Sequence, residues 1–169
     1  MNRTTIMAEH AATEVRVAGL GRIAIIASPH GLVRVEFLAD TSPRIRTTGT
    51  GAPAEIRDYA VRELQAYVRG DGVLACPVDF ALLPPFQCRV MKALRRIKRG
   101  TTITYGGLAE RVGNPGAARA IGNACGGNPV ALWVPCHRVL ASGGRLGGFS
   151  GGLDIKRALL RIEGVSVAG

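Results

Sequence analysis

The spacing of apolar residues changes halfway along this chain of 169 residues, and the change limits the folds open to it. Residues 23–27 are all apolar, residues 28–31 read Ser-Pro-His-Gly, and residues 32–37 largely alternate between apolar and charged side chains. This pattern predicts antiparallel hairpin strands covered on one face. From residue 86 onward, apolar residues recur every three or four positions, as they do on helices. We therefore expect the α+β class, with a small sheet-and-helix lobe before a mainly helical lobe.

A segment rich in proline separates the two expected lobes. In the first lobe, Pro53 opens an amphipathic helix that ends near Gly70. The residues that follow have no helical period and include Pro77, Pro84 and Pro85, which is typical of a connection. The expected boundaries are a flexible tail over residues 1–13, a first lobe over residues 14–75, a connecting loop over residues 76–85 and a second domain over residues 86–169.

The excess positive charge lies entirely in the second half of the chain. Residues 1–85 have nine arginines and nine acidic residues, whereas residues 86–169 have thirteen Lys and Arg and only three acidic residues. The formal net charge of +10 therefore belongs to the second half. A basic half beside a neutral half suggests a surface for a polyanion, most commonly nucleic acid. An arginine-rich composition without such a partner is the alternative.

Several classes of protein are excluded by what the sequence lacks. Apolar runs such as residues 23–27 are far shorter than the roughly 20 residues of a membrane span, and residues 1–12 lack the apolar segment of a secretory signal. We expect a soluble, cytoplasmic protein that does not bind membranes. The four cysteines form no Cys-x-x-Cys pair and have no histidine at zinc-finger spacing, so neither a structural zinc site nor a disulfide framework is expected.

Two short helices are predicted in the basic half, over residues 106–112 and 116–125. A turn containing glycine joins them, with Asn114 as a candidate cap and Pro115 suited to the first helical position. This arrangement fits a helix-turn-helix, although helix pairs of this length are also common in ordinary cores.

The second of these helices has an almost bare surface, and Arg119 is its one long side chain. Small residues would let the backbone approach a groove closely; they are Gly116, Ala117, Ala118, Ala120, Gly122 and Ala124. The arginine is open to three interpretations: a solvated charge, a phosphate anchor, or a wedge whose guanidinium plane enters a stack of bases.

A Cys-His pair is the candidate for covalent chemistry. The strand-like run 128–134 leads into Pro135-Cys136-His137-Arg138, and a glycine-rich loop over residues 143–152 follows. A free thiol has a pKa of about 8.5, so a nucleophilic cysteine needs a base or a positive field. Neighbouring side chains in a strand point to opposite faces, so contact between Cys136 and His137 would require a turn or a bridging water. An inert buried cysteine beside a core histidine is the alternative.

Five further segments place this pair in a recognisable context. The chain reads PCHRV over residues 135–139, GGFSGG over residues 147–152 and LLRIEG over residues 159–164. With Thr104-Tyr105, NPGAARA from residue 114 and Gly127-Asn128-Pro129, these motifs resemble the O6-alkylguanine-DNA alkyltransferases, or methylated-DNA–protein-cysteine methyltransferases. The resemblance runs from about Phe86 to Val165. The first half is similar only in layout to the family's ribonuclease-H-like domain.

The resemblance implies direct-reversal repair, in which the protein's own cysteine irreversibly takes an alkyl group from O6 of guanine, and also from O4 of thymine. Cys136 would be the acceptor, while His137, through a water, and Glu163 would draw off the thiol proton. Asn128 would brace the turn around the site, and Tyr105 would donate a proton or hydrogen bond to the leaving guanine. No cofactor and no metal would be required.

The resemblance also implies a damaged base flipped out of double-stranded DNA by a monomer that enters the minor groove largely independently of sequence. The expected base pocket comprises Tyr105, Val139, Phe149, Ser150 and Trp133. The expected DNA-binding residues are Arg119, Ala118, Ala120, Asn114, Gly122 and Asn123. Arg119 would fill the gap in the base stack.

Some residues depart from the family pattern, and two other functions remain open. Phe149 stands where the family often has tyrosine, Trp133 is bulkier than the usual aliphatic residue, and Cys88 is interpreted as packing. One alternative is a helix-turn-helix DNA-binding protein without alkyl transfer, in which Cys136 is an ordinary core thiol. The other is a Cys-His hydrolase with an oxyanion hole and multiple turnover.

Overall fold

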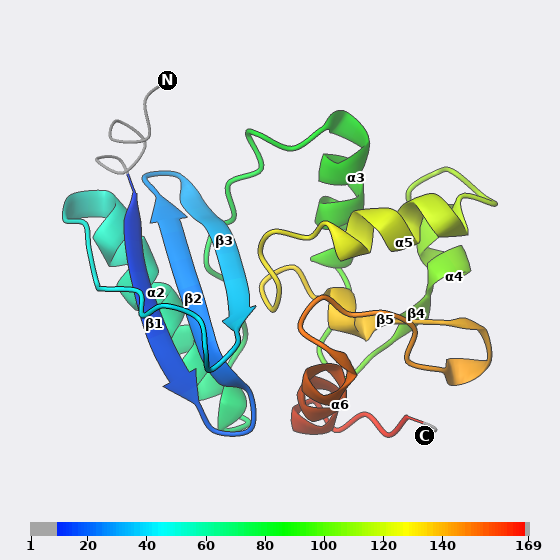
Figure 1. Ribbon diagram of the computed structural model, residues 1–169. Helices are drawn as coiled ribbons and strands as arrows, with labels where there is room; N and C mark the ends of the chain where they lie inside the picture. The colour runs from blue at the N-terminus through cyan, green and yellow to red at the C-terminus, as the bar shows by residue number, and fades with distance from the viewer. Residues whose placement is uncertain (1–9, 168–169) are drawn as a thin grey trace. The chain divides into compact units, whose positions relative to one another are not determined.

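The computed structural model describes residues 10–167 and confirms the α+β class (Figure 1). The chain forms two compact units, divided between Ala81 and Leu82, and this division falls inside the predicted connection. Within the described residues, no helix has the length and apolar character needed to span a membrane.

The first unit is a three-stranded antiparallel sheet packed against one helix. Its strands, in the order β1-β2-β3, are β1 (Ala11–Val17), β2 (Gly21–Ser28) and β3 (Gly31–Leu38), and its helix is α2 (Gly51–Val68). The register between β2 and β3 runs from Arg22 opposite Leu38 to Ser28 opposite Gly31, which confirms the predicted hairpin and its turn. The helix packs on β1 and β2, and its Leu64 and Tyr67 are buried in the core.

The predicted first lobe is too short at both ends. Strand β1 begins at Ala11, so the predicted flexible tail over residues 1–13 is wrong for residues 11–13. Residues 1–9 of that tail lie outside the described part of the chain. Ala11 and Thr13 pair with β2 and are both buried, while Ala12 between them is not, as expected of a strand with one covered face. At the other end, Leu32 bonds through its backbone to Pro77 and Asp79 (2.8 and 2.9 Å). The first unit therefore extends into the segment that was predicted to be a free connection.

The second unit is mainly helical, as predicted. Its helices are α3 (Pro85–Leu94), α4 (Tyr105–Arg111), α5 (Ala118–Gly126) and α6 (Leu153–Ile162). The first three pack against one another, and α4 and α5 are the two short helices expected from the sequence. Asn114 does not cap α5, contrary to the prediction, because its carbonyl accepts the Ala117 amide (3.2 Å) and closes an extra turn before the helix begins.

A short parallel pairing that the sequence did not predict organises the site. Strand β4 (Ile103–Thr104) pairs with β5 (Val139–Leu140), with Ile103 opposite Val139. Helix α4 starts directly after β4, and a single-turn 3-10 helix, η1 (Cys136–Arg138), directly precedes β5. A second single turn, η2 (Ser142–Gly144), follows β5. The pairing thus brings the start of α4 next to the Cys-His pair.

The apolar run before the Cys-His pair is a buried turn, so the predicted strand over residues 128–134 is wrong. The Val134 amide donates to the Val130 carbonyl (2.9 Å), which folds the run back on itself. Leu132, at the tip, has a φ of 78°, a left-handed conformation that is uncommon for a residue with a side chain. The run is apolar because it is buried, although its backbone is not extended, and this explains why its sequence resembled a strand.

Candidate active site

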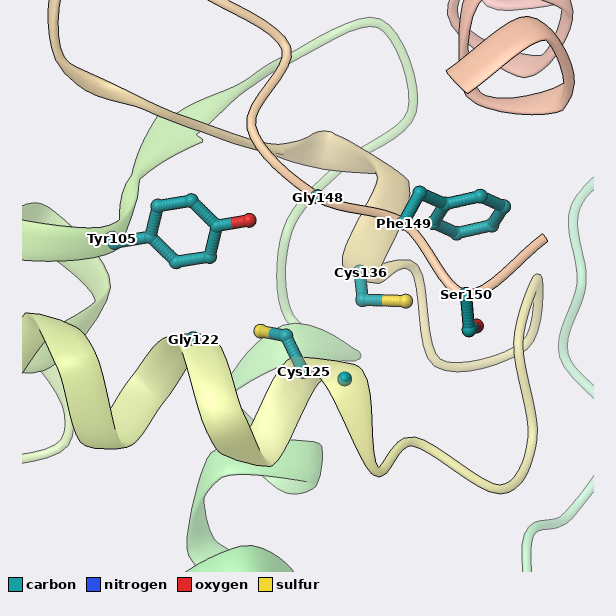
Figure 2. A pocket seen from close by; sticks show the side chains of 8 residues that line it. Tyr105, Gly122, Cys125, Cys136, Gly148, Phe149 and Ser150 are labelled. Carbon is teal, nitrogen blue, oxygen red and sulfur yellow. The ribbon is translucent and has the colours of Figure 1, made fainter. Parts of the chain in front are cut away.

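A cavity of about 270 Å³ lies within the second unit, and the sulfur of Cys136 is at its wall (Figure 2). Its walls come from α4, α5, η1 and the glycine-rich segment before α6. The lining residues are Tyr105, Gly122, Cys125, Gly126, Cys136, Gly148, Phe149 and Ser150. Small-molecule pockets commonly measure about 300–1,000 Å³, so this cavity is at the small end and suits one flat ring system.

Cys136 is almost fully buried, with 4% of its surface exposed, and it starts the η1 turn. Burial raises the pKa of its thiol, because a thiolate loses the solvation that water gives it. The Asn128 amide, which donates to Sγ at 3.1 Å, and the positive charge of Lys156 act in the opposite direction. The resting group is therefore a neutral thiol that needs a base before it can attack.

Asn128 holds the turn that carries Cys136. Its Oδ1 accepts the Val130 amide (3.0 Å), and its Nδ2 donates both to the Val134 carbonyl (2.8 Å) and to the Cys136 sulfur. The side chain is buried. One amide thus closes the turn and orients the thiol, as expected of a bracing residue.

Behind the thiol, His137 and Glu163 form a buried pair. His137 Nε2 lies 3.0 Å from Glu163 Oε1, and both side chains are fully enclosed. Within the described residues, His137 Nδ1 has no hydrogen-bond partner. Burial lowers the pKa of His137, while the Glu163 carboxylate partly offsets this effect. With Nε2–H donating to the carboxylate, Nδ1 is left as an acceptor of a proton.

Arg138 adds a cation to this His137–Glu163 pair, and the sequence analysis assigned it no role. Its Nε donates to Glu163 Oε2 (2.9 Å) and its Nη2 to Oε1 (2.7 Å), a two-pronged contact. The Gly100 amide also reaches Oε2 (3.3 Å). A buried carboxylate needs such partners to stay ionised, so Arg138 keeps Glu163 available to the imidazole.

Lys156 is a further buried cation that the sequence analysis missed. It lies on α6, with no exposed surface, and its ammonium donates to the carbonyls of Val139 (2.6 Å), Leu146 and Gly148 (3.3 Å). Burial lowers the pKa of the lysine to about 8. Hydrogen bonds from an ammonium to carbonyl oxygens favour its charged form. Lys156 thereby ties β5 to the glycine-rich segment that lines the cavity.

Tyr105 closes the cavity on the side of α4 (Figure 2). Burial raises the pKa of its phenol, so it remains a hydrogen-bond donor at neutral pH. The loop passes close to the ring: a Cβ at Gly147, whose φ is 65°, would lie 3.0 Å from the tyrosine oxygen. Only glycine fits there without a shift of the loop.

The predicted base pocket is partly brought together. Tyr105, Phe149 and Ser150 line the cavity, whereas Val139 and Trp133 do not. Trp133 is buried in the turn before Cys136, and the Val139 carbonyl is occupied by Lys156. The rings of Phe149 and His137 form a T-shaped pair, with an angle of 87° between their planes and centroids 6.5 Å apart. Two unpredicted members, Cys125 and Gly126, come from α5.

A second hollow adjoins the cavity on the outside of α5. This groove measures about 560 Å³ and shares Tyr105 and Gly122 with the cavity. Of the predicted DNA-binding residues, those lining it are Ala118, Arg119, Gly122 and Asn123. Ala120 and Asn114 are exposed but lie outside its walls.

The missed residues differ in how they could have been found. Lys156 falls on the apolar side of α6, between Leu153 and Leu159. A cation on the apolar side of an amphipathic helix is a sequence pattern that could have identified it as a buried residue. Cys125 shows no distinguishing pattern. Within residues 10–167, no group of three or more His, Cys, Asp or Glu side chains is arranged to hold a metal ion.

The sequence of the second unit is similar to a known domain. Residues 85–165 match the family described as 6-O-methylguanine DNA methyltransferase, DNA binding domain. The methylated-DNA–protein-cysteine methyltransferase of Mycobacterium tuberculosis is 44% identical over 137 residues, which cover 79% of this chain and 82% of that protein. The protein of the same name from Methanosarcina acetivorans is 38% identical over 148 residues, covering 86% and 93%.

The fold is similar to solved structures over both units. The crystal structure of Mycobacterium tuberculosis O6-methylguanine methyltransferase matches with a TM-score of 0.77 and 36% identity, covering 91% of this chain and 92% of that one. A crystal structure of Mycobacterium tuberculosis OGT in complex with DNA matches with a TM-score of 0.76 and 37% identity, covering 90% and 91%.

Proposed function

The chain belongs to the 6-O-methylguanine DNA methyltransferase family, and we propose that it repairs DNA by moving an alkyl group from O6 of guanine to the sulfur of its own Cys136. The observation that carries the proposal is the position of that sulfur. The sulfur faces a cavity of about 270 Å³. The imidazole of the next residue in the turn, His137, pairs with the buried carboxylate of Glu163 at the end of α6.

The reaction is an in-line displacement at the alkyl carbon. A new bond forms between Sγ and that carbon, the carbon–O6 bond breaks, and its electron pair passes to the guanine. The thiol loses one proton and the guanine gains one, so ordinary guanine and a thioether result. No redox change occurs and no cofactor is required. Because water does not hydrolyse a thioether, each molecule acts once.

His137 is proposed to take the thiol proton. The raised pKa of buried Cys136 and the lowered pKa of His137 leave both groups neutral at rest, so the proton must move as the alkyl carbon arrives. The unpartnered Nδ1 is the available acceptor, through a bridging water. Glu163, held by Arg138, would stabilise the resulting imidazolium.

Tyr105 is proposed to assist the departure of guanine. Its phenol faces the cavity and, with a raised pKa, remains protonated at neutral pH. A phenol can donate a hydrogen bond to a purine ring as negative charge develops there. Ser150 and the backbone of the glycine-rich loop would contact the edge of the base.

The base must leave the duplex before it can reach Cys136, because the alkyl carbon lies inside the stack. The bare α5 helix beside the groove is proposed to enter the minor groove of double-stranded DNA, with Arg119 filling the place of the extruded base. The DNA backbone would lie against four other residues of this region: Asn114, Ala118, Ala120 and Asn123. We further propose that the protein acts as a cytoplasmic monomer and also accepts O4-alkylthymine.

Incubation with an excess of duplex carrying one labelled O6-methylguanine tests the proposal. We expect one methyl group per protein molecule, however long the reaction runs, and none on Cys136→Ser. A DNA-binding protein without alkyl transfer would bind the duplex and acquire no label. A Cys-His hydrolase would turn over repeatedly and stay unlabelled, and either result would contradict the proposal.

A further inference from the structure

A third concave site, outside the cavity and the α5 groove, lies between α3 and α4. It measures about 240 Å³, and four of its six lining residues are cations: Arg89, Lys92, Arg96 and Arg111, with Ala93 and Val112. We call this the basic pocket. The two helices that form it pack against each other in the second unit.

The charges of the basic pocket are not neutralised within the described residues. All four cationic side chains are exposed, none forms an ion pair with residues 10–167, and none of the lining residues is acidic. The Arg89 guanidinium is held over the Phe86 ring, 5.6 Å from its centroid. Like charges around one hollow repel, and a concave surface of one sign concentrates counter-ions. Such a site favours a polyanion.

The basic pocket is distinct from the groove on α5. The two share no residue, and α5 contributes none to the basic pocket. The groove takes residues 104–106 at the start of α4, whereas the basic pocket takes Arg111 and Val112 at its end. Seven helical residues separate these ends by roughly 10 Å, so one phosphate cannot serve both sites.

We propose that the basic pocket binds phosphate groups of the DNA backbone outside the stretch held by the α5 groove, an inference that rests on the proposed function. Arg89 lies on α3 and Arg96 in the turn directly after it, seven residues further on, which is roughly 10 Å at the helical rise per residue. One strand of duplex DNA presents a phosphate about every 3.4 Å along its axis, so this length matches about three phosphates. Arginine and lysine at exposed positions contact such phosphates without reading sequence.

The test measures binding to an undamaged duplex of several helical turns at a series of salt concentrations. Lys92→Gln/Arg96→Gln removes two cations from the basic pocket, and Arg157→Gln/Arg161→Gln removes two from α6, which lines neither hollow. Each phosphate contact contributes about 0.9 to the slope of log K against log salt. We expect the pocket variant to lower the slope by about two and the control to change it by less than half as much.

Arg111→Gln tests the same site from α4 and is expected to lower the slope by about one. Unchanged slopes in both pocket variants, or an equal change in the control, would overturn the proposal. A third result would also overturn it: inorganic pyrophosphate stabilises the wild type but not the pocket variant, while the salt slope of DNA binding is the same in both. The basic pocket would then be a site for a free anion.

Transfer from a free O6-alkylguanine base separates this proposal from the function itself. That reaction requires no DNA, so all variants are expected to react at the wild-type rate. If the wild type fails to react with free base or damaged duplex, the proposed function fails, while the salt slopes still decide whether the basic pocket binds DNA.

Discussion

The two ring nitrogens of His137 have opposite surroundings. Nε2 meets the Glu163 carboxylate at 3.0 Å, while Nδ1 has no partner within the described residues. Burial lowers the pKa of the ring, and the nearby Arg138 acts in the same direction. The neutral ring, with its proton on Nε2, is therefore the form present at neutral pH, and it is the form that can accept a proton.

This arrangement predicts the pH profile of alkyl transfer. The rate should follow the neutral fraction of His137. Because the folded pKa lies below the ordinary 6.5, the single-turnover rate should be level above pH 6.5 and decline only below it. DNA affinity measured over the same range separates chemistry from binding. A tenfold rise per pH unit between 7 and 9 would instead indicate that a spontaneous Cys136 thiolate limits the rate.

Lys156 is predicted to be a positioning residue. Lys156→Met would leave the buried carbonyls of Val139 and Leu146 without their donor, at a cost of about 1–3 kcal/mol for each unsatisfied group. Chemical denaturation measures that loss, and Arg157→Met, on the neighbouring residue, is the control. Folded Lys156→Met should also bind free O6-alkylguanine more weakly. An unchanged stability would show that these contacts contribute nothing.

At the scale of elements, the sequence predicted what regular spacing encodes. The β2–β3 hairpin, α2 and the four helices of the second unit follow apolar periodicity and turn residues. The buried turn over residues 130–134 does not, because an apolar run is compatible with either a strand or a buried turn. The side-chain amide of Asn128 decides between them, and such a long-range contact leaves no periodic pattern.

Site residues divide in the same way. Cys136, His137, Glu163 and Tyr105 were expected from the family motifs. The structure places Cys136 and Tyr105 at one cavity, while the paired side chains of His137 and Glu163 are fully enclosed and do not line it. Lys156 was missed because a cation on an amphipathic helix is normally solvated. Trp133 and Val139 were expected in the pocket wall, but sequence spacing alone does not tell which side of a turn faces a cavity.

The exposed position of Arg119 on α5 leads to a prediction about base extrusion. Arg119→Ala should slow transfer from a methylated duplex by roughly 10- to 1,000-fold, because extrusion costs a few kcal/mol and each 1.4 kcal/mol is a factor of ten. Transfer from the free base should be unchanged, since no stack must be opened. Rapid mixing with both substrates measures the ratio. Equal slowing with both substrates would place Arg119 in the chemistry instead.

For the whole molecule, the charge division matches the division into units. The first unit, which ends at Ala81, has a net charge near zero. The basic second unit contains the cavity and the groove, both of which are lined by residues of α5. Although Cys136 faces the cavity, its sulfur is tightly held, since the residue is 4% exposed and the Asn128 amide donates to Sγ at 3.1 Å. A methyl group on that sulfur would crowd this contact.

Alkylation is therefore predicted to destabilise the protein. Extra methyl groups in packed interiors cost about 1–3 kcal/mol, so the methylated form should melt at a lower temperature than the free thiol. Calorimetry on protein before and after reaction with methylated DNA, with the DNA removed, measures the difference. Cys136→Ser taken through the same treatment is the control. An equal or higher melting temperature after alkylation would contradict the prediction.

The central claim concerns one sulfur out of two, because Cys125 lines the same cavity as Cys136 and burial raises its pKa to about 12. Both cysteines fall between Arg119 and Arg138, on one tryptic peptide, so fragment sequencing by mass spectrometry after reaction with methylated duplex must locate the methyl group. We predict that the methyl group lies on Cys136 alone, and that Cys125→Ser still accepts it. A methyl group on Cys125, or transfer that persists in Cys136→Ser, would contradict the account.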